Sequence, residues 1–161
     1  MLLVRAYLGS STIHGIGLFA AELIPQGTRT WELTPPFDLI LSSLEVQSLP
    51  GHARERFLHF AYHNSNDEYV LCWDDARFAN HSNEPNTSFV AADIPYEYAV
   101  CDILAGEELT INYAQFDEDI ARNAPAAFWL KHKGRSVGVS EITNHDRWRS
   151  SEAVRRRRAT E

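Results

Sequence analysis

Three consecutive residues, Asn80, His81 and Ser82, carry a dense set of hydrogen-bonding groups within one short stretch of the chain. An amide, an imidazole and a hydroxyl can bind a polar ligand, or they can satisfy the backbone of a turn. The residues that follow, Glu84-Pro85-Asn86, are typical of a turn, because proline fixes φ and asparagine bonds its own backbone. Alone, this stretch predicts a polar surface loop. Two other segments of the chain decide whether it binds a ligand.

The first of these segments is Gly15-Ile16-Gly17-Leu18-Phe19-Ala20, which satisfies the dinucleotide-binding pattern G-x-G-x-x-A. A dinucleotide site needs a strand directly before the first glycine and a full helix directly after the pattern. Here Ser10-Ser11-Thr12 comes before the glycines, and Pro25-Gln26-Gly27 would end any helix early. The context therefore excludes a dinucleotide fold. What is left is a glycine turn between strands, or a place where backbone groups approach a ligand closely.

The second segment is Gly106-Glu107-Glu108-Leu109-Thr110-Ile111-Asn112-Tyr113. Taken in order, the three segments resemble the signature of the SET-domain protein-lysine methyltransferases. Residues 77–86 match the family's R-F-x-N-H-S-x-x-P-N element, and residues 106–113 match G-E-E-L-T-x-D-Y except that Asn112 replaces the usual Asp. Each segment is short, but their joint match is specific and extends over roughly residues 10–116.

The resemblance implies a cofactor, S-adenosyl-L-methionine, and nominates the residues that contact it. Ile16 and Gly17 would do so through their backbone, because glycine permits close approach. Asn80 would hydrogen-bond the amino-acid end of the cofactor, and His81 would contact adenine. The resemblance implies no metal in the reaction.

Tyr113 is the residue that the resemblance nominates as catalytic. A tyrosine after a short strand is most often a core residue whose hydroxyl is bonded at the edge, but its place at the end of the motif reverses that expectation. Phe89 and Ile111 lie where the family places residues that shape the channel for the substrate lysine. The implied activity is transfer of a methyl group to a lysine amine in a protein or peptide.

The chain departs from many family members in lacking a zinc site. Those members carry a cysteine after N-H-S and three more beyond the tyrosine, whereas here Asn83 follows N-H-S and no cysteine follows Cys101. The resemblance is therefore to small stand-alone members without the post-SET zinc site. Another group has an aromatic pair in a C-terminal helix instead. Phe128 and Trp129 resemble that pair, and they either contact adenine or only anchor the helix.

These matches predict a SET domain over residues 1–118 and a C-terminal helical extension over residues 119–161 that completes the cofactor site. The extension ends in a basic tail with four arginines at residues 155–158. Such a run can bind nucleic acid, although a solvated helix end fits the acidic remainder of the chain better. The resemblance also implies a fold of several small β-sheets, with a knot-like threading of the C-terminal segment, which is an exception to the usual rule against threaded chains.

Short β-prone runs between turn residues independently predict a mainly β fold. We expect strands over residues 2–8, 18–21, 28–33, 69–73, 87–91, 98–103 and 109–112. Two helices are predicted between them, one that Ser42 or Ser43 caps and that extends to Leu49, and one over residues 53–62. A third begins at Asp117-Glu118-Asp119, where the helix dipole favours acidic side chains.

The helix over residues 53–62 raises the possibility of a metal-binding face, because His59 and His63 are four positions apart. No cysteine or acidic ligand accompanies them, so a solvated helix face is the favoured interpretation and no metal is expected.

The composition agrees with a single folded domain, with or without a short appendage, because 44% of the 161 residues are hydrophobic. A net charge of −7 disfavours broad nucleic-acid binding and suits a basic substrate. Two cysteines, and no apolar run near the length of a membrane span, indicate a cytoplasmic protein. A nuclear or effector role and a homodimer are compatible with this, as is a SET-like module that binds a protein without catalysis.

Overall fold

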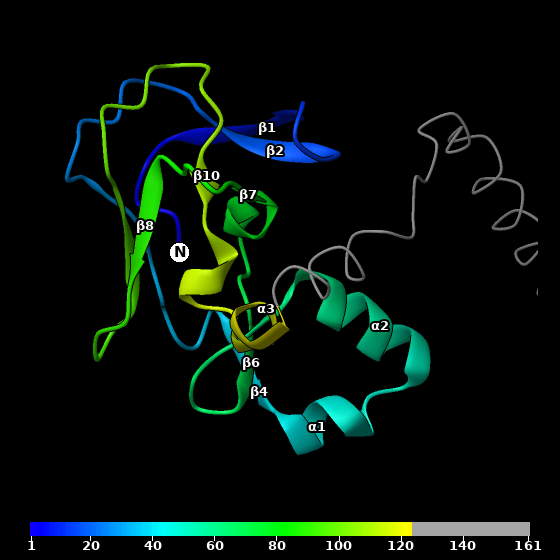
Figure 1. Cartoon of the computed structure of the whole chain (residues 1–161). Coiled ribbons are helices and arrows are strands. Elements are labelled where there is room, and N and C mark those ends of the chain that lie inside the picture. The colour runs from blue at the N-terminus through cyan, green and yellow to red at the C-terminus, as the bar shows by residue number, and fades with distance from the viewer. Residues whose placement is uncertain (124–161) are drawn as a thin grey trace, which may run out of the picture. The chain divides into compact units, whose positions relative to one another are not determined.

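Small β-sheets dominate residues 1–123, the part of the chain that the computed structural model describes (Figure 1). Ten strands form four sheets in this part of the chain. The antiparallel sheets are β1 (Ala6–Ser10) with β2 (Ile16–Ala20), β3 (Arg29–Glu32) with β9 (Tyr96–Ala99) and β8 (Thr87–Val90), and β4 (Leu39–Ser42) with β6 (Glu68–Leu71) and β5 (Tyr62–His63). The fourth is a parallel pair of β7 (Asn80–His81) and β10 (Thr110–Ile111). The predicted mainly β fold of several small sheets is confirmed.

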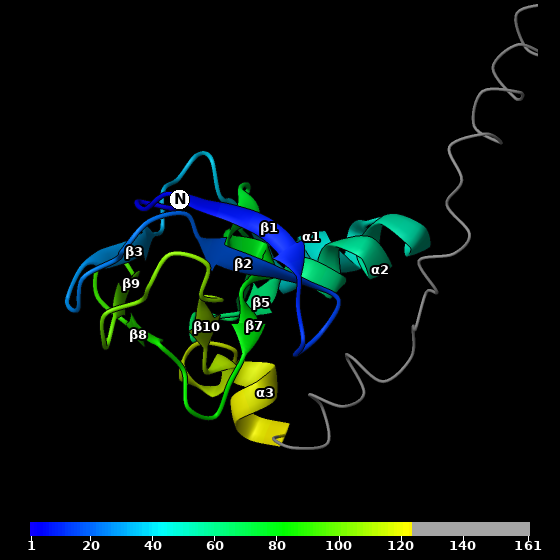
Figure 2. The same ribbon diagram turned by 90° about the horizontal axis from the view of Figure 1, so that it is seen from above.

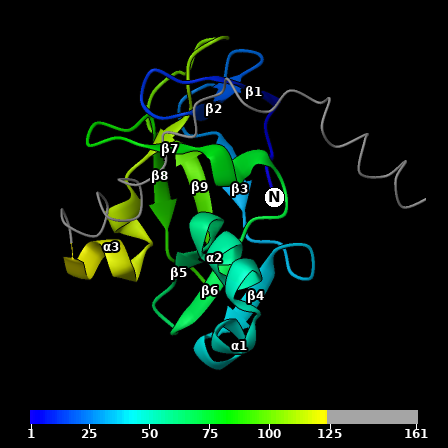
Figure 3. The ribbon, with the colours of Figure 1, turned by 90° about the vertical axis from the view of Figure 1, so that its right-hand side faces the viewer.

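The parallel pair β7–β10 lies between two larger parts of the fold. In Figures 1 and 3 the β1–β2 hairpin lies at one end and β4, β6 and α1 (Ser43–Ser48) lie at the other, with β7 between them. The view from above places β7 and β10 near the centre of the described residues (Figure 2). Both strands carry residues that the sequence singles out.

The N-terminal strand begins later than predicted, at Ala6 rather than at residue 2. Leu2 forms a single β-bridge with Trp31, and the amide of Leu3 donates to the carbonyl of Thr30, so this first part of the chain follows β3 instead. The β1–β2 turn contains Gly15 at φ +49°, in the left-handed region that favours glycine. The glycine segment is therefore a turn between strands, as one of the two interpretations predicted.

Ser42 caps α1 as predicted. Its hydroxyl accepts from the amide of Glu45, while the Glu45 carboxylate accepts from the amide of Ser42 at 2.8 Å. This reciprocal capping box satisfies two donors that a helix N-terminus leaves unpaired. Hydrogen bonding to Ser42 also lowers the pKa of Glu45.

The second helix, α2 (Gly51–Phe60), ends two residues earlier than predicted, and Ala61 is already extended. His63 consequently lies on β5, so His59 and His63 do not share a helix face and the alternative of a metal site on one helix face is wrong. Among residues 1–123 no group of three histidine, cysteine, aspartate or glutamate side chains could hold a metal ion.

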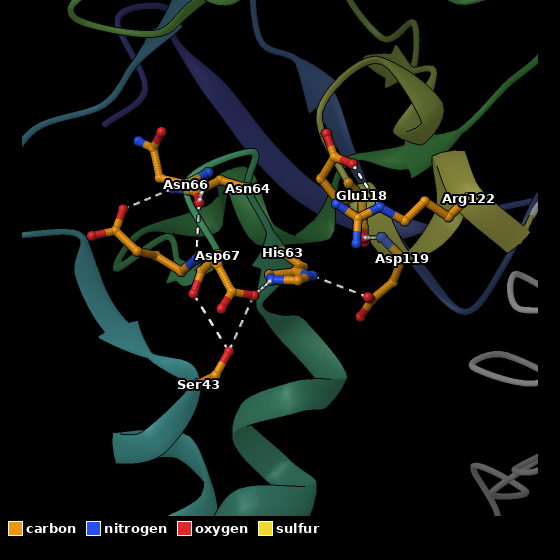
Figure 4. Close-up of polar contacts among 10 residues, drawn as sticks. Ser43, His63, Asn64, Asn66, Asp67, Glu118, Asp119 and Arg122 are labelled. Carbon is orange, nitrogen blue, oxygen red and sulfur yellow. Dashed lines mark hydrogen bonds and ion pairs between the residues drawn. The ribbon is translucent and has the colours of Figure 1, made fainter.

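His63 instead attaches the third helix, α3 (Glu118–Asn123), to the β5–β6 hairpin (Figure 4). Its Nδ1 lies 3.0 Å from Oδ1 of Asp119 and its Nε2 lies 2.9 Å from Oδ1 of Asp67. The ring also stacks on Tyr69, with centroids 4.6 Å apart. We call His63, Asp67 and Asp119 the ionic clasp.

Two apolar clusters form the core. One joins the β1–β2 hairpin to the chain after β9 and consists of Leu18, Ala20, Ile24, Ala99, Ile103 and Leu109. The other is formed by the buried faces of α1 and α2 and consists of Val46, Phe57 and Ala61. No helix within residues 1–123 is long and apolar enough to cross a membrane.

The predicted helix start at residues 117–119 is confirmed by α3. The remainder of the predicted C-terminal extension, its basic tail and the knot-like threading involve residues beyond 123 and stay predictions, as does the domain boundary at residue 118.

Candidate active site

Strands β7 and β10 place two of the three sequence segments side by side. Asn80 pairs with Thr110 and His81 pairs with Ile111, and the amide of Ser82 donates to the Ile111 carbonyl at 3.1 Å. Asn86 extends this contact, because its Oδ1 accepts from the Thr110 amide at 2.8 Å. The turn that the Glu84-Pro85-Asn86 sequence predicts is thus fastened to the third segment by backbone and side-chain bonds.

The third segment also pairs with the glycine segment on its other side. The amide of Leu109 donates to the Leu18 carbonyl at 2.7 Å, and the amide of Ala20 donates to the Glu107 carbonyl at 2.9 Å. Residues 106–113 therefore contact both β2 and β7, and all three sequence segments meet in one place.

Glu108 joins the three segments through its carboxylate. Oε1 accepts from Nδ2 of Asn80 at 2.7 Å, and Oε2 accepts from the hydroxyl of Ser11 at 2.9 Å. A Cβ built on Gly17 would lie 2.2 Å from Oε1 of Glu108, so the carboxylate occupies the space that a side chain at residue 17 would take. Sequence reasoning missed Glu108 as a site residue, although its place in the G-E-E-L motif was a signal.

Asn80 is buried and uses its amide to hold the glycine segment. Nδ2 donates to the carbonyls of His14 and Ile16 at 3.1 and 3.2 Å, besides the bond to Glu108. A bond from Asn80 to a cofactor would therefore involve other atoms than this amide nitrogen. The predicted cofactor contacts of Ile16, Gly17, Asn80 and His81 stay predictions, but the four residues lie in adjoining segments.

The His81 ring is held in one tautomer next to Tyr113. Its Nδ1 accepts from the amide of Tyr113 at 3.2 Å, and its Nε2 lies 3.2 Å from Oδ1 of Asn83. Because Nδ1 accepts, the hydrogen of the neutral ring is on Nε2 and points to the Asn83 oxygen. The rings of His81 and Tyr113 meet edge to face at 5.3 Å.

Tyr113 begins a short 3-10 turn that Asn112 caps. Oδ1 of Asn112 accepts from the Ala114 amide at 3.0 Å, a bond that the aspartate usual at this position can also make. The Tyr113 hydroxyl donates to the carbonyl of Ala79 at 2.7 Å. Burial raises the pKa of Tyr113, and the charges of Asp117, Glu97 and Glu108 raise it further, so the hydroxyl stays protonated.

Phe116 links Tyr113 to two further aromatic rings. Phe116 contacts Tyr113 at 5.8 Å, Phe89 at 5.3 Å and Tyr62 at 4.9 Å between ring centroids. We call Tyr62, Phe89, Tyr113 and Phe116 the aromatic cluster. Phe89 is thus connected to Tyr113 through Phe116. Burial, followed by the charge of Cys72, raises the pKa of Tyr62.

Tyr62 and Phe116 were not predicted, because the first was assigned to a helix end and the second lies outside the motifs. Ile111, the other residue predicted to shape the channel, is only 2% exposed and faces the core next to β7. Phe128 and Trp129 lie outside the described residues.

A comparison with protein-family models finds the SET domain, which matches residues 15–114 and so more than half of the chain. The chain belongs to the SET-domain family. The match includes the glycine segment, β7, β10 and Tyr113, the elements that meet at the candidate site.

Solved structures share the SET fold. A candidate histone methyltransferase of Plasmodium falciparum aligns with a TM-score of 0.50 and 18% identity over 70% of this chain and 95% of its own, a likeness that shows the fold alone. A humanized Polycomb Repressive Complex 2 of Chaetomium thermophilum, bound to an inhibitor, aligns with a TM-score of 0.57 and 27% identity over 74% of this chain.

An active Polycomb Repressive Complex 2 in its basal state aligns with a TM-score of 0.56 and 26% identity over 68% of this chain. This SET-domain chain spans only 16% and 15% of the two Polycomb chains that it matches. A comparison with curated proteins finds no match.

Proposed function

We propose that this SET-domain protein transfers a methyl group from S-adenosyl-L-methionine to the side-chain amine of a lysine in a protein or peptide. The observation that carries the proposal is the meeting of the three segments at Tyr113, whose hydroxyl is part-buried and protonated and whose ring contacts both His81 and Phe116. The net charge of −7 favours a basic substrate.

The residues present fit such a cofactor. At the glycine turn, a Cβ built on Gly15 would meet nothing within 4 Å, and the Ile16 side chain is 51% exposed, so backbone and apolar surface are both accessible there. Asn80 holds that turn through its bond to the Ile16 carbonyl, and Glu108 accepts a bond from the same amide of Asn80. Ile16, Gly17 and His81 would hold the cofactor, which supplies a methyl group activated by a positive sulfur.

The main task that remains for the protein is to present a neutral amine in line with that methyl group. A free lysine has a pKa of about 10.4, so holding it neutral at pH 7 costs about 4.6 kcal/mol in water. The aromatic cluster disfavours a charged ammonium because its rings exclude water. Apolar walls also fix the direction of the amine, which an in-line displacement requires.

Tyr113 would orient the reacting amine through its hydroxyl. The bond to the Ala79 carbonyl fixes the hydrogen of that hydroxyl, and the raised pKa keeps it neutral, so Tyr113 acts as a positioned dipole and not as an anion.

A non-catalytic SET-like module is the second candidate. The replacement of the usual Asp by Asn112 is the sequence feature that favours it. Asn112 keeps the capping bond to Ala114, so this replacement gives no structural reason to expect a broken site.

The test is labelling of a panel of basic proteins with methyl-labelled cofactor, comparing wild type with Tyr113→Phe. We expect the variant to label about a hundredfold more slowly, because it loses the hydroxyl oxygen that orients the amine. Calorimetry should show that it still binds S-adenosyl-L-methionine. Tyr7→Phe, whose side chain is 48% exposed on β1, is the matched control and should label like wild type.

Equal labelling by Tyr113→Phe and wild type would contradict the role of Tyr113. No cofactor binding by wild type would overturn the enzyme and leave the non-catalytic module.

A further inference from the structure

Glu97 is an acidic residue on the inner face of the sheet formed by β3, β9 and β8. Strand β9 lies between β3 and β8, and Glu97 pairs with Trp31 on one side and with Phe89 on the other. Directly paired residues project from the same face of a sheet. Trp31 is 1% exposed in the core, so this is the inner face.

The neighbours of Glu97 along β9 confirm its direction. Arg29 stacks on the ring of Tyr96 at 3.9 Å, and the Arg29 side chain is exposed and ion-paired to Glu32. Alternate residues of a strand point to opposite faces, so Tyr96 faces outward and Glu97 faces inward.

The inner face next to Glu97 is the aromatic cluster. Phe89, its partner on β8, contacts Phe116, which contacts both Tyr62 and Tyr113. The charge of Glu97 acts on both phenols, since it contributes to the raised pKa of Tyr62 and of Tyr113. Glu97 therefore lies within electrostatic reach of the hydroxyl assigned to the reaction.

The Glu97 carboxyl is enclosed by protein but is not sealed off. Part of the residue remains solvent-exposed, as does part of Phe89. Within residues 1–123 no hydrogen bond or ion pair engages this carboxyl, although buried carboxyls usually have one. Burial raises the pKa of Glu97 to about 8, with the charge of Asp74 adding to the effect and the N-terminal amino group opposing it.

We propose that Glu97 binds the ammonium group of the substrate lysine and takes the proton that must leave before methyl transfer. This inference rests on the proposed methyltransferase function. One N–H bond of the ammonium breaks and its proton moves to a carboxylate oxygen of Glu97, giving a neutral amine and a carboxylic acid. The amine lone pair then forms the bond to the methyl carbon, and the electron pair of the breaking carbon–sulfur bond stays on sulfur. The carboxylic acid returns its proton to solvent after the product leaves.

A carboxyl with a pKa of about 8 is better matched to this step than an ordinary one. It is a stronger base than an exposed glutamate, and the approach of a cation stabilises its ionised form. The other titratable groups near it are Tyr62, Tyr113 and Cys72, whose pKa values are all raised, and the carboxylate of Asp74. The two phenols and the thiol stay neutral around pH 8, and the N-terminal amino group, which opposes the shift of Glu97, is the remaining charged group that acts on it.

The experiment measures kcat and KM between pH 6 and 10 for wild type and Glu97→Gln, with methyl-labelled cofactor and a lysine-rich peptide. Because kcat/KM follows the free enzyme, wild type should gain about tenfold per pH unit below pH 8 and then level off. Glu97→Gln should be about a hundredfold less active at pH 8 and should lose this rise. Cofactor binding by calorimetry should not change, and Glu97→Asp should recover part of the activity.

Glu22→Gln, at an exposed site between β2 and β3, is the matched control and should keep the wild-type profile. The inference is overturned if Glu97→Gln stays within twofold of wild type, or if it is slow but keeps the rise toward pH 8. A wild type that binds cofactor but methylates no peptide overturns the proposed function itself, a different result from an active Glu97→Gln.

Discussion

The two residues of β5 hold the segment after Tyr113 by two different kinds of contact. Tyr62 packs on Phe116 in the aromatic cluster, and His63 bonds Asp119 in the ionic clasp. Neighbouring residues of a strand point to opposite faces, so one short strand reaches both contacts. In the aromatic cluster burial keeps Tyr62 and Tyr113 neutral, whereas the ionic clasp joins an imidazole to two carboxylates that are both partly exposed.

Within the described residues, the segment from Tyr113 to Asp119 is held by aromatic packing at Phe116 and by a polar contact at Asp119. The aromatic side depends on excluded water, which salt hardly weakens, and the ionic side is partly exposed and can be screened. Substitutions in the two groups of contacts, and at Glu97 beside the aromatic cluster, should therefore differ in their response to salt and pH.

Phe116→Ala should disrupt the packing of the aromatic cluster. Removing a ring that contacts Tyr62, Phe89 and Tyr113 should lower the free energy of unfolding by about 3 kcal/mol, the low end for loss of a large side chain because Phe116 is only partly buried. Urea unfolding at 0.05 and 1 M NaCl should give the same loss. Phe37→Ala, at a 58% exposed ring, is the control and should cost much less. A loss that disappears in salt would show that the packing is not apolar.

Glu97→Gln should stabilise the protein by an amount that depends on pH. The folded protein holds the proton of Glu97 up to about pH 8, whereas the unfolded chain releases it near the ordinary value of 4.5. Wild type therefore loses stability, relative to the variant, as the pH rises from 4.5 to 8, and the difference is constant above 8. Between pH 6 and 7.5 the difference should grow by at most about 2 kcal/mol. Urea unfolding at several pH values measures it, and a constant difference would show that the carboxyl of Glu97 is not buried.

His63→Gln should remove the imidazole contacts of the ionic clasp. We expect a loss of about 1 kcal/mol in the free energy of unfolding at 0.05 M NaCl, because the amide keeps some packing on Tyr69 but carries no charge. The loss should shrink at 1 M NaCl, in contrast to that of Phe116→Ala. An equal loss at both salt concentrations would assign His63 to packing instead.

The two carboxylates of the ionic clasp should differ. The side chain of Asp67 is 80% exposed and that of Asp119 is 48% exposed, so the bond to Asp119 is the less screened of the two. Asp119→Asn should cost about 0.5 kcal/mol and Asp67→Asn less. The order is checked by thermal unfolding at low salt, and the reverse order would show that side-chain exposure does not decide the strength of the two bonds.

Local patterns predicted the elements whose cause is local. The serine cap of α1, predicted at Ser42 or Ser43, and the start of α3 follow from residues a few positions apart. The three motifs also predicted which segments meet, since their combination is specific to one fold.

What sequence alone could not predict depends on residues far apart in the chain. Strands β5 and β7 have two residues each, too few for an alternating pattern, so His63 was assigned to a helix. In the sequence Glu97 cannot be told from other acidic residues, and it is distinguished only by its place between β3 and β8. Phe116 is likewise distinguished only by its contacts with Tyr62 and Phe89. Such burial arises from sheet order, which short strands do not encode locally.

The bond between Ser11 and Glu108 joins positions 97 residues apart. During synthesis the glycine hairpin leaves the ribosome long before the carboxylate that fixes it exists. Nascent chains that stop short of residue 108 should therefore hold an unfastened hairpin, and the site should assemble late, in a step that closes a very large loop of chain.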